Sequence, residues 1–134
     1  VGDNWKARGS GRTSDGTAHP EMQINIMNAR VAQLVAQDPE RRALAGDQLY
    51  LDLDLGAENL PPGTELEIGE AVLVVTDQPH LGCKKFVRRF GVEAMKFVNA
   101  VDRRHLNLRG INARVKKPGR IEVGDIARRR IPRR

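Results

Sequence analysis

The residue best suited to chemistry in this chain is its single cysteine, Cys83, which comes shortly after the apolar run Ala71–Val75. A thiolate, rather than a thiol, is the nucleophile and the metal ligand, and neighbouring cations lower the pKa of a cysteine below its free value of about 8.5. Lys84 and Lys85 follow Cys83 directly. We therefore expect a reactive thiol at Cys83, with an inert buried thiol as the alternative.

His80 lies three residues before Cys83 and is a candidate general base for it. A base of this kind must reach the nucleophile and needs a third group to orient it, and Asp77 is the nearest carboxylate in the sequence. The competing interpretation makes His80 a loop or strand-end residue that bonds to backbone. His19 and His105 have no motif around them, and one Cys with three scattered His forms no zinc pattern.

The composition is that of one globular domain, with 40% hydrophobic and 30% charged residues. No apolar run approaches the ~20 residues that cross a bilayer, and a lone cysteine permits no internal disulfide. We therefore predict a cytoplasmic protein without membrane contact. Asp52 and Asp54 share one face of a predicted strand, but no third ligand lies near them in the sequence, so we interpret them as solvent-facing.

Charge divides the chain at the cysteine. Residues 1–82 carry 6 Lys/Arg and 13 Asp/Glu, a net charge of −7, whereas residues 83–134 carry 17 and 4, a net charge of +13. A basic half of this strength suits an anionic partner such as a phosphorylated cofactor, an acidic protein or nucleic acid. The aromatic residues after Cys83 have core spacing rather than the exposure that single-strand binding needs, which disfavours nucleic acid.

The elements that must position these residues are mostly strands. Residues 1–21 are rich in turn formers and form a predicted N-terminal arm, and residues 128–134 form a basic C-terminal tail. Between them, apolar periodicity predicts the following elements: a short strand around 24–27, a helix from about 28 to 37, strands at 49–55, 65–70 and 71–76, a helical stripe over 86–98 broken at Gly91, and strands at 111–115 and 120–123.

The predicted fold is mainly β, a small closed or partly closed β-barrel with two or three short helices. Closely spaced strands favour a barrel or a sandwich over a parallel βαβ sheet.

The order of landmarks over residues 22–127 resembles the MOSC domain, named for the C-terminal domain of molybdenum-cofactor sulfurases. The landmarks are the Gln23–Met27 entry, the Pro62-Gly63-Thr64 turn, the strand pair around 68–73, the Pro79–Cys83 element, and the series Ala113-Arg114-Val115, Pro118-Gly119 and Gly124-Asp125. The resemblance implies a barrel-like fold and handling of the molybdenum cofactor. In the family, the matching cysteine is proposed to carry sulfur or to ligate molybdenum.

The resemblance makes Cys83 the catalytic residue, as a thiolate, a persulfide or a molybdenum ligand, in a sulfur-transfer or reductase protein. Its expected partners are the molybdenum cofactor (molybdopterin) or a sulfur-donor protein. The expected cofactor-binding residues are His80, Lys84, Lys85, Arg88, Asn112 and Arg114.

Two departures from the family pattern suggest an alternative. No His-Gly-Gly element occurs near the N-terminus, and Gly46-Asp47-Gln48 stands where fuller members have Arg-Glu-Asn or Gly-Glu-Asn, so a polar contact expected there is not assured by sequence. The alternative is a non-catalytic basic module that has kept the fold and binds an anionic partner.

Overall fold

The computed structural model describes residues 17–81 and 84–130. Its elements, in chain order, are the 3-10 helix η2 (Pro20–Met22), β1 (Ile24–Asn28), α1 (Ala29–Ala36), the 3-10 helix η3 (Pro39–Ala45), β2 (Leu49–Leu51), β3 (Glu65–Ile68), β4 (Ala71–Pro79), α2 (Lys84–Phe90), α3 (Val92–Asn99), the 3-10 helix η4 (Val101–Leu106), β5 (Ile111–Lys117) and β6 (Ala127–Arg129).

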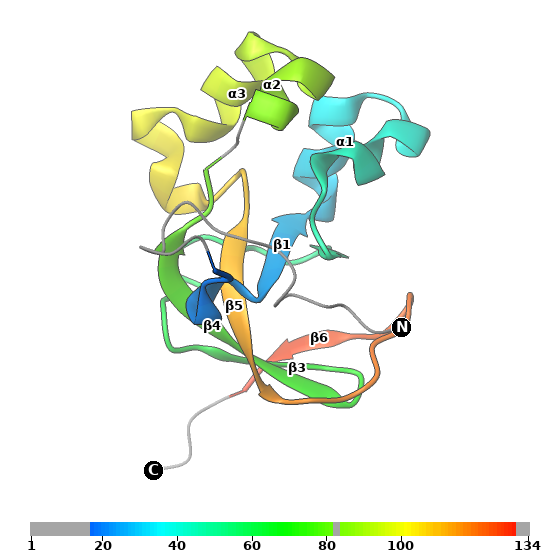
Figure 1. Ribbon diagram of the computed structural model, residues 1–134, viewed down its shortest axis with the longest axis vertical. Coiled ribbons are helices and arrows are strands. Elements are labelled where there is room, and N and C mark those ends of the chain that lie inside the picture. The colour runs from blue at the N-terminus through cyan, green and yellow to red at the C-terminus, as the bar shows by residue number, and fades with distance from the viewer. Residues whose placement is uncertain (1–16, 82–83, 131–134) are drawn as a thin grey trace.

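The strands form one mixed six-stranded sheet in the order β2-β1-β5-β4-β3-β6, and this sheet curls nearly into a barrel. Only β1 and β2 are parallel; β1–β5, β5–β4, β4–β3 and β3–β6 are antiparallel. Figure 1 shows the three α-helices gathered at one end of the sheet, with β3 and β6 at the other. The predicted mainly β, barrel-like fold is confirmed.

The passage from β1 into α1 has a local cause. The Oδ1 atom of Asn28 accepts hydrogen bonds from the backbone N–H groups of Arg30 (2.8 Å) and Val31 (3.2 Å), which have no partner within the helix. The helix ends where Gln37 takes a left-handed conformation with φ of 62°. The sequence pattern of a strand leading into a helix is therefore correct, and Asn28 is the residue that joins the two.

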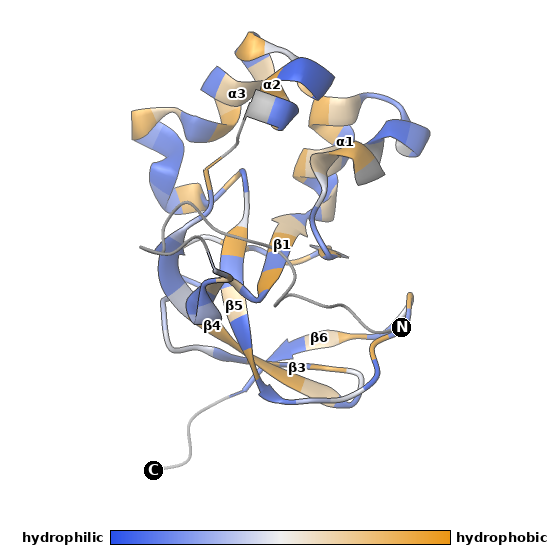
Figure 2. Ribbon diagram, in the orientation of Figure 1, coloured by the Kyte–Doolittle hydropathy of each residue, from blue (hydrophilic) through white to orange (hydrophobic). Residues whose placement is uncertain are grey.

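Alternation along the strands divides the apolar residues between two cores. Ile26, Leu66, Leu73 and Ala113 point into the barrel, together with Leu55 and Leu60 from the connection after β2. On the outer face, Met27 packs with Ala32 and Ala45 beneath the helices. Figure 2 shows hydrophobic and hydrophilic residues alternating along β1 and β5. Each fully buried large aliphatic side chain contributes about 1.5–3 kcal/mol to folding.

The structure changes three sequence-based boundaries. The strand predicted at 49–55 ends at Leu51, and Asp54 turns the chain by accepting a hydrogen bond from the N–H group of Gly56 (2.8 Å). Residues 120–123 are not a strand. The last strand is β6, which pairs with β3, so that Arg128 and Arg129 belong to the sheet.

In the folded chain, charged residues of the acidic half form ion pairs with charged residues of the basic half. Glu65 and Glu67 of β3 contact Arg130, and Glu65 also contacts Lys116 of β5. Cations of the basic half therefore meet carboxylates of the acidic half across neighbouring strands. Within the described residues, no helix has the length and apolar character needed to span a bilayer.

Candidate functional site

The thiol-bearing segment connects β4 to α2. Cys83, and with it the thiolate, persulfide and molybdenum-ligand roles predicted for it, lies outside the described residues. On its N-terminal side the segment is flanked by His80 and Leu81, which follow β4. On its C-terminal side it is flanked by Lys84, the first residue of α2. The described part of the site therefore consists of the residues that hold these two flanks.

The flank before Cys83 is held by a buried ionic cluster of Asp47, His80 and Arg109. The Asp47 carboxylate is fully buried, and one oxygen lies 2.7 Å from His80 Nε2 while the other accepts a hydrogen bond of 2.7 Å from Arg109 Nη1. The His80 and Arg109 side chains are only 10% and 6% exposed. A buried charge needs this degree of pairing, because an uncompensated one would cost several kcal/mol.

Three separate parts of the chain supply this cluster. Asp47 follows η3, where Gly46 takes a φ of 81° that favours glycine. His80 follows β4 directly, and Arg109 comes shortly before β5. Arg109 also donates from Nη2 to the carbonyl of Ala45 (3.0 Å), which ties the turn after η3 to the start of β5.

The same arginine reaches the flank after Cys83. The Arg109 guanidinium lies over the ring of Phe86, 4.9 Å from its centroid. Phe86 is 2% exposed and also contacts the ring of Phe90 at 5.0 Å. Such cation–π contacts stabilise by about 0.5–2 kcal/mol. Arg109 thus links the end of β4, through Asp47 and His80, to α2.

Tyr50 lies beside the cluster, and the pKa of its hydroxyl is affected by the cluster. Burial raises the pKa of the Tyr50 hydroxyl above its ordinary value of 10.0, and the nearby Asp47 carboxylate raises it further. The Tyr50 oxygen accepts a hydrogen bond of 3.3 Å from the backbone N–H group of Asp47. Tyr50 is therefore a neutral neighbour of the carboxylate at physiological pH.

The predicted orienting residue for His80 was wrong. Asp77 is exposed, and its carboxylate accepts a hydrogen bond from the side chain of Gln78 at 3.4 Å. The carboxylate at His80 is Asp47, which lies 33 positions earlier in the sequence. The competing interpretation of His80, as a strand-end residue bonded to backbone, does not describe this contact either, because its partner is a side chain.

The other residues predicted to hold a cofactor do not converge on one point. Asn112 is fully buried; its Nδ2 donates to the carbonyls of Gln78 (3.1 Å) and Pro79 (3.4 Å), and its Oδ1 has no hydrogen-bond partner among the described residues. Arg114, 42% exposed on the side chain, faces Glu21 at 3.8 Å. Lys85 and Arg88 are exposed on α2, which Lys84 begins. Among the predicted cofactor-binding residues whose side chains the structure describes, His80 and Asn112 are the two that lie close to the end of β4.

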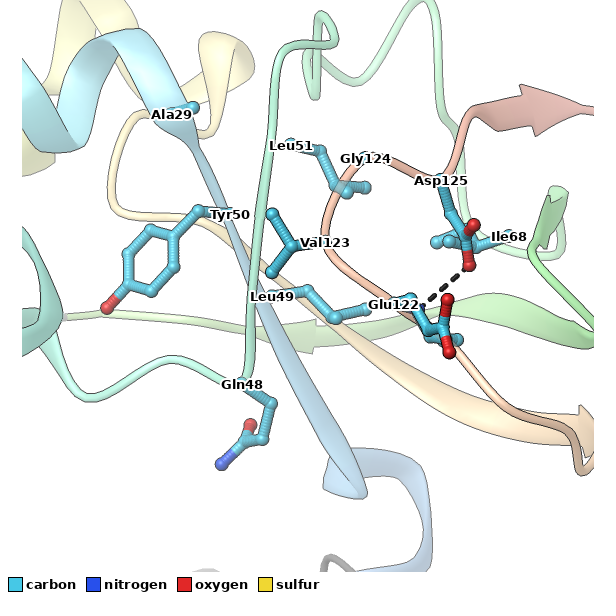
Figure 3. Close-up of a pocket in the computed structure, with 11 residues that line it drawn as sticks. Ala29, Gln48, Leu49, Tyr50, Leu51, Ile68, Glu122, Val123, Gly124 and Asp125 are labelled. Atoms are coloured by element: carbon cyan, nitrogen blue, oxygen red, sulfur yellow. Dashed lines mark hydrogen bonds between the residues drawn. The ribbon is translucent and has the colours of Figure 1, made fainter. Parts of the chain in front are cut away.

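Two cavities flank His80, of about 220 Å³ on the η4 side and about 200 Å³ on the barrel side. A larger groove of about 520 Å³ lies between β2 and residues 121–125. Figure 3 shows Leu49, Leu51 and Val123 gathered in this groove and Tyr50 turned the other way. None of the predicted site residues lines the groove, and its walls are mainly apolar.

Sequence reasoning missed Asp47 and Arg109 as site residues. Asp47 could have been found from the family pattern, because it stands at the position where fuller members have glutamate; its carboxylate contacts His80 and Arg109. Arg109 carried no signal in spacing or composition. Within the residues that the structure describes, no cluster of three or more His, Cys, Asp and Glu residues could hold a metal ion.

The fold and the cluster define a small, nearly closed β-barrel that holds both flanks of a cysteine-bearing segment. The sequence model of the MOSC domain matches residues 15–128, so the chain belongs to the MOSC domain family. The family is associated with the molybdenum cofactor.

One solved structure shares the fold at low sequence identity, and a second gives a lower score. The crystal structure of a hypothetical protein superposes with a TM-score of 0.56 at 20% identity, covering 84% of this chain and 54% of its own. The chain thus spans about half the length of that relative. The YuaD protein from Bacillus subtilis gives a TM-score of 0.48 at 18% identity, covering 87% of this chain and 71% of its own. None of the curated proteins matches the chain significantly.

Proposed function

We propose that this MOSC domain carries sulfur on Cys83 as a persulfide. The observation that supports this proposal most directly is the family match, which covers the cysteine, together with the buried Asp47–His80–Arg109 cluster on its flanks. His80 stands three residues before Cys83, and Phe86, under Arg109, stands three residues after it. Rigid flanks suit a thiol that must meet a donor in a defined position.

The charges near the segment favour a thiolate. Lys85 and Arg88 are exposed on α2 within five residues of Cys83, and no carboxylate pairs with either among the described residues. Cations near a cysteine favour its ionised form. The proposed step is attack of this thiolate on the terminal sulfur of a donor persulfide. A new S–S bond forms on Cys83, the donor S–S bond breaks, and the donor leaves as a thiolate, without net oxidation.

Direct binding of the molybdenum cofactor is the second candidate, and the described residues do not fit it well. The cavities beside His80 hold about 220 and 200 Å³, below the ~300–1,000 Å³ of ordinary ligand pockets. Asn112 is sealed and occupied with backbone carbonyls. Arg114 faces a carboxylate at 3.8 Å. We therefore derive no step through the bound cofactor and place the molybdenum centre, if one is involved, outside this chain as the destination of the sulfur.

The basic binding module has less support. Lys116, Arg120 and Arg130 of the basic half are paired with glutamates. The exposed cations that remain on α2 lie next to the thiol-bearing segment rather than across a broad face.

The proposal is tested by mass spectrometry of the intact protein after exposure to a persulfide donor such as glutathione persulfide. We expect a gain of one sulfur atom, about 32 Da, that dithiothreitol removes and that Cys83→Ser abolishes. Metal analysis of protein from molybdenum-sufficient cells tests the second candidate. Absence of the sulfur increment, with molybdenum bound in proportion to protein, would replace sulfur carriage by cofactor ligation.

A further inference from the structure

The larger of the two cavities beside His80 is lined by several polar side chains. The cavity of about 220 Å³, here called the His80 cavity, is bounded on its polar side by His80, Asn99, Arg104, Asn107 and Arg109. It lies between the end of β4, α3 and the end of η4. Leu81 and Arg104, both exposed, are part of its wall, so that a ligand can enter from solvent.

The Asp47 carboxylate decides which ring nitrogen of His80 carries the proton. An ionised carboxylate only accepts hydrogen bonds, so the 2.7 Å contact requires an N–H group at Nε2. Arg109 neutralises the same carboxylate from its other oxygen. A neutral imidazole with a proton on Nε2 has a free electron pair on Nδ1. No hydrogen bond among the described residues uses Nδ1.

Gly110 lies close to the imidazole ring. A Cβ atom at Gly110 would lie 2.8 Å from His80 Cδ2 and 2.3 Å from the carbonyl oxygen of Ile26. Gly110 also has a φ of 132°, a backbone conformation that residues with a side chain rarely adopt. The Cδ2 edge of the imidazole therefore lies close to the Gly110 backbone, and a side chain at this position would clash with the ring.

The remaining polar groups of the cavity define what it can hold. Arg104 supplies a guanidinium that pairs with no carboxylate in the described part of the chain. The side-chain Nδ2 groups of Asn99 and Asn107 each donate one hydrogen bond elsewhere, to Met95 Sδ (3.0 Å) and to the carbonyl of Leu55 (2.9 Å) respectively. The lining thus includes one guanidinium and one imidazole with a basic ring nitrogen, around a space equal to about seven water molecules.

We propose that the His80 cavity binds a compact anionic thiol, with its negative group toward Arg104 and its S–H group donating to His80 Nδ1. In the reaction, the S–H bond breaks, a bond forms between the proton and Nδ1, and the electron pair stays on sulfur as a thiolate. Asp47 stabilises the resulting imidazolium. This inference rests on the proposed function, since the thiolate would take the sulfane sulfur from a persulfide, but the binding and the tautomer are properties of the described residues alone.

The tautomer is tested by NMR of ¹⁵N-labelled protein, in which long-range ¹H–¹⁵N spectra resolve the ring nitrogens of its three histidines. We expect the neutral form of His80 to show a proton on Nε2 and a bare Nδ1. In Asp47→Asn, we expect the two tautomers to mix. A wild-type His80 whose neutral form is protonated on Nδ1 would overturn the assignment of a proton acceptor.

Binding is tested with mercaptoacetate, titrated into the Cys83→Ser protein so that no disulfide or persulfide can form. We expect shifts at His80, Arg104 and Gly110, and at least tenfold weaker binding after Arg104→Gln. Lys96→Gln is the matched control, because it removes one exposed cation from α3 outside the cavity. Acetate and ethanethiol should each bind more weakly than mercaptoacetate, since each lacks one of the two groups.

No shift at the cavity, or equal affinity in Arg104→Gln and wild type, would overturn the inference. Its failure is distinguishable from that of sulfur carriage. If a persulfide forms on Cys83 but mercaptoacetate does not bind, only the proposed ligand of the His80 cavity is rejected. If mercaptoacetate binds but no persulfide forms, the ligand proposal is kept and sulfur carriage by Cys83 is rejected.

Discussion

Replacing Arg109 by Met tests whether the buried cluster holds the two flanks of the thiol-bearing segment together. The substitution leaves the Asp47 carboxylate, 0% exposed, with His80 and without its cation. Removing one partner of a buried ion pair costs about 3–5 kcal/mol, because the remaining charge is desolvated without compensation. Loss of the guanidinium from the Phe86 ring adds to this cost. A domain with a total stability of about 5–15 kcal/mol should therefore lose a large part of it.

Urea unfolding followed by circular dichroism measures this loss. Arg114→Gln is the control, because Arg114 faces Glu21 at 3.8 Å with both side chains 42% exposed, and exposed pairs contribute only about 0–1 kcal/mol. Asp47→Asn combined with Arg109→Met should recover part of the loss, since no charge then remains unpaired. A loss below about 1 kcal/mol for Arg109→Met, equal to that of the control, would refute a buried ionic cluster.

Three further predictions concern the barrel and its helical layer. The Lys116 hydrogen bond is the main cause that holds the pKa of Glu65 below its ordinary value of 4.5; the stabilisation is therefore present above that pH and is lost as pH falls through the lowered pKa. Glu65→Gln should flatten the acid limb of a stability–pH curve, and an unchanged limb would contradict the assignment. Gly110→Ala should destabilise more than Gly63→Ala in thermal unfolding, because a Cβ at Gly110 meets a backbone oxygen at 2.3 Å whereas Gly63 has open space around it; equal losses would mean that backbone strain alone decides the cost. Asn28→Ala should cost about 0.5–2 kcal/mol through loss of the helix cap, and Asn28→Ser should restore most of it.

Much of the fold could be predicted because it depends on periodicity. Alternating leucines from Leu49 onward predict one face toward the barrel, and Leu55 is indeed 2% exposed. The apolar run Ala71–Val75 predicts a central strand, and β4 lies between β3 and β5. The strand predicted at 120–123 failed for a different reason: the apolar pattern there is real, but a turn closes where the backbone N–H group of Glu122 donates a hydrogen bond of 2.8 Å to Oδ2 of Asp125.

The sequence by itself determined which residues carry reactive groups and which faces of the strands are apolar, since both follow from side-chain chemistry and local spacing. Only the tertiary structure decided the partners of those groups. Asp77 lies three residues from His80, yet residues an odd number apart in an extended chain point to opposite sides. Asp47 and Arg109 reach His80 because β1, β4 and β5 bring distant turns to one end of the sheet, and a buried carboxylate is stable there only with both partners in place.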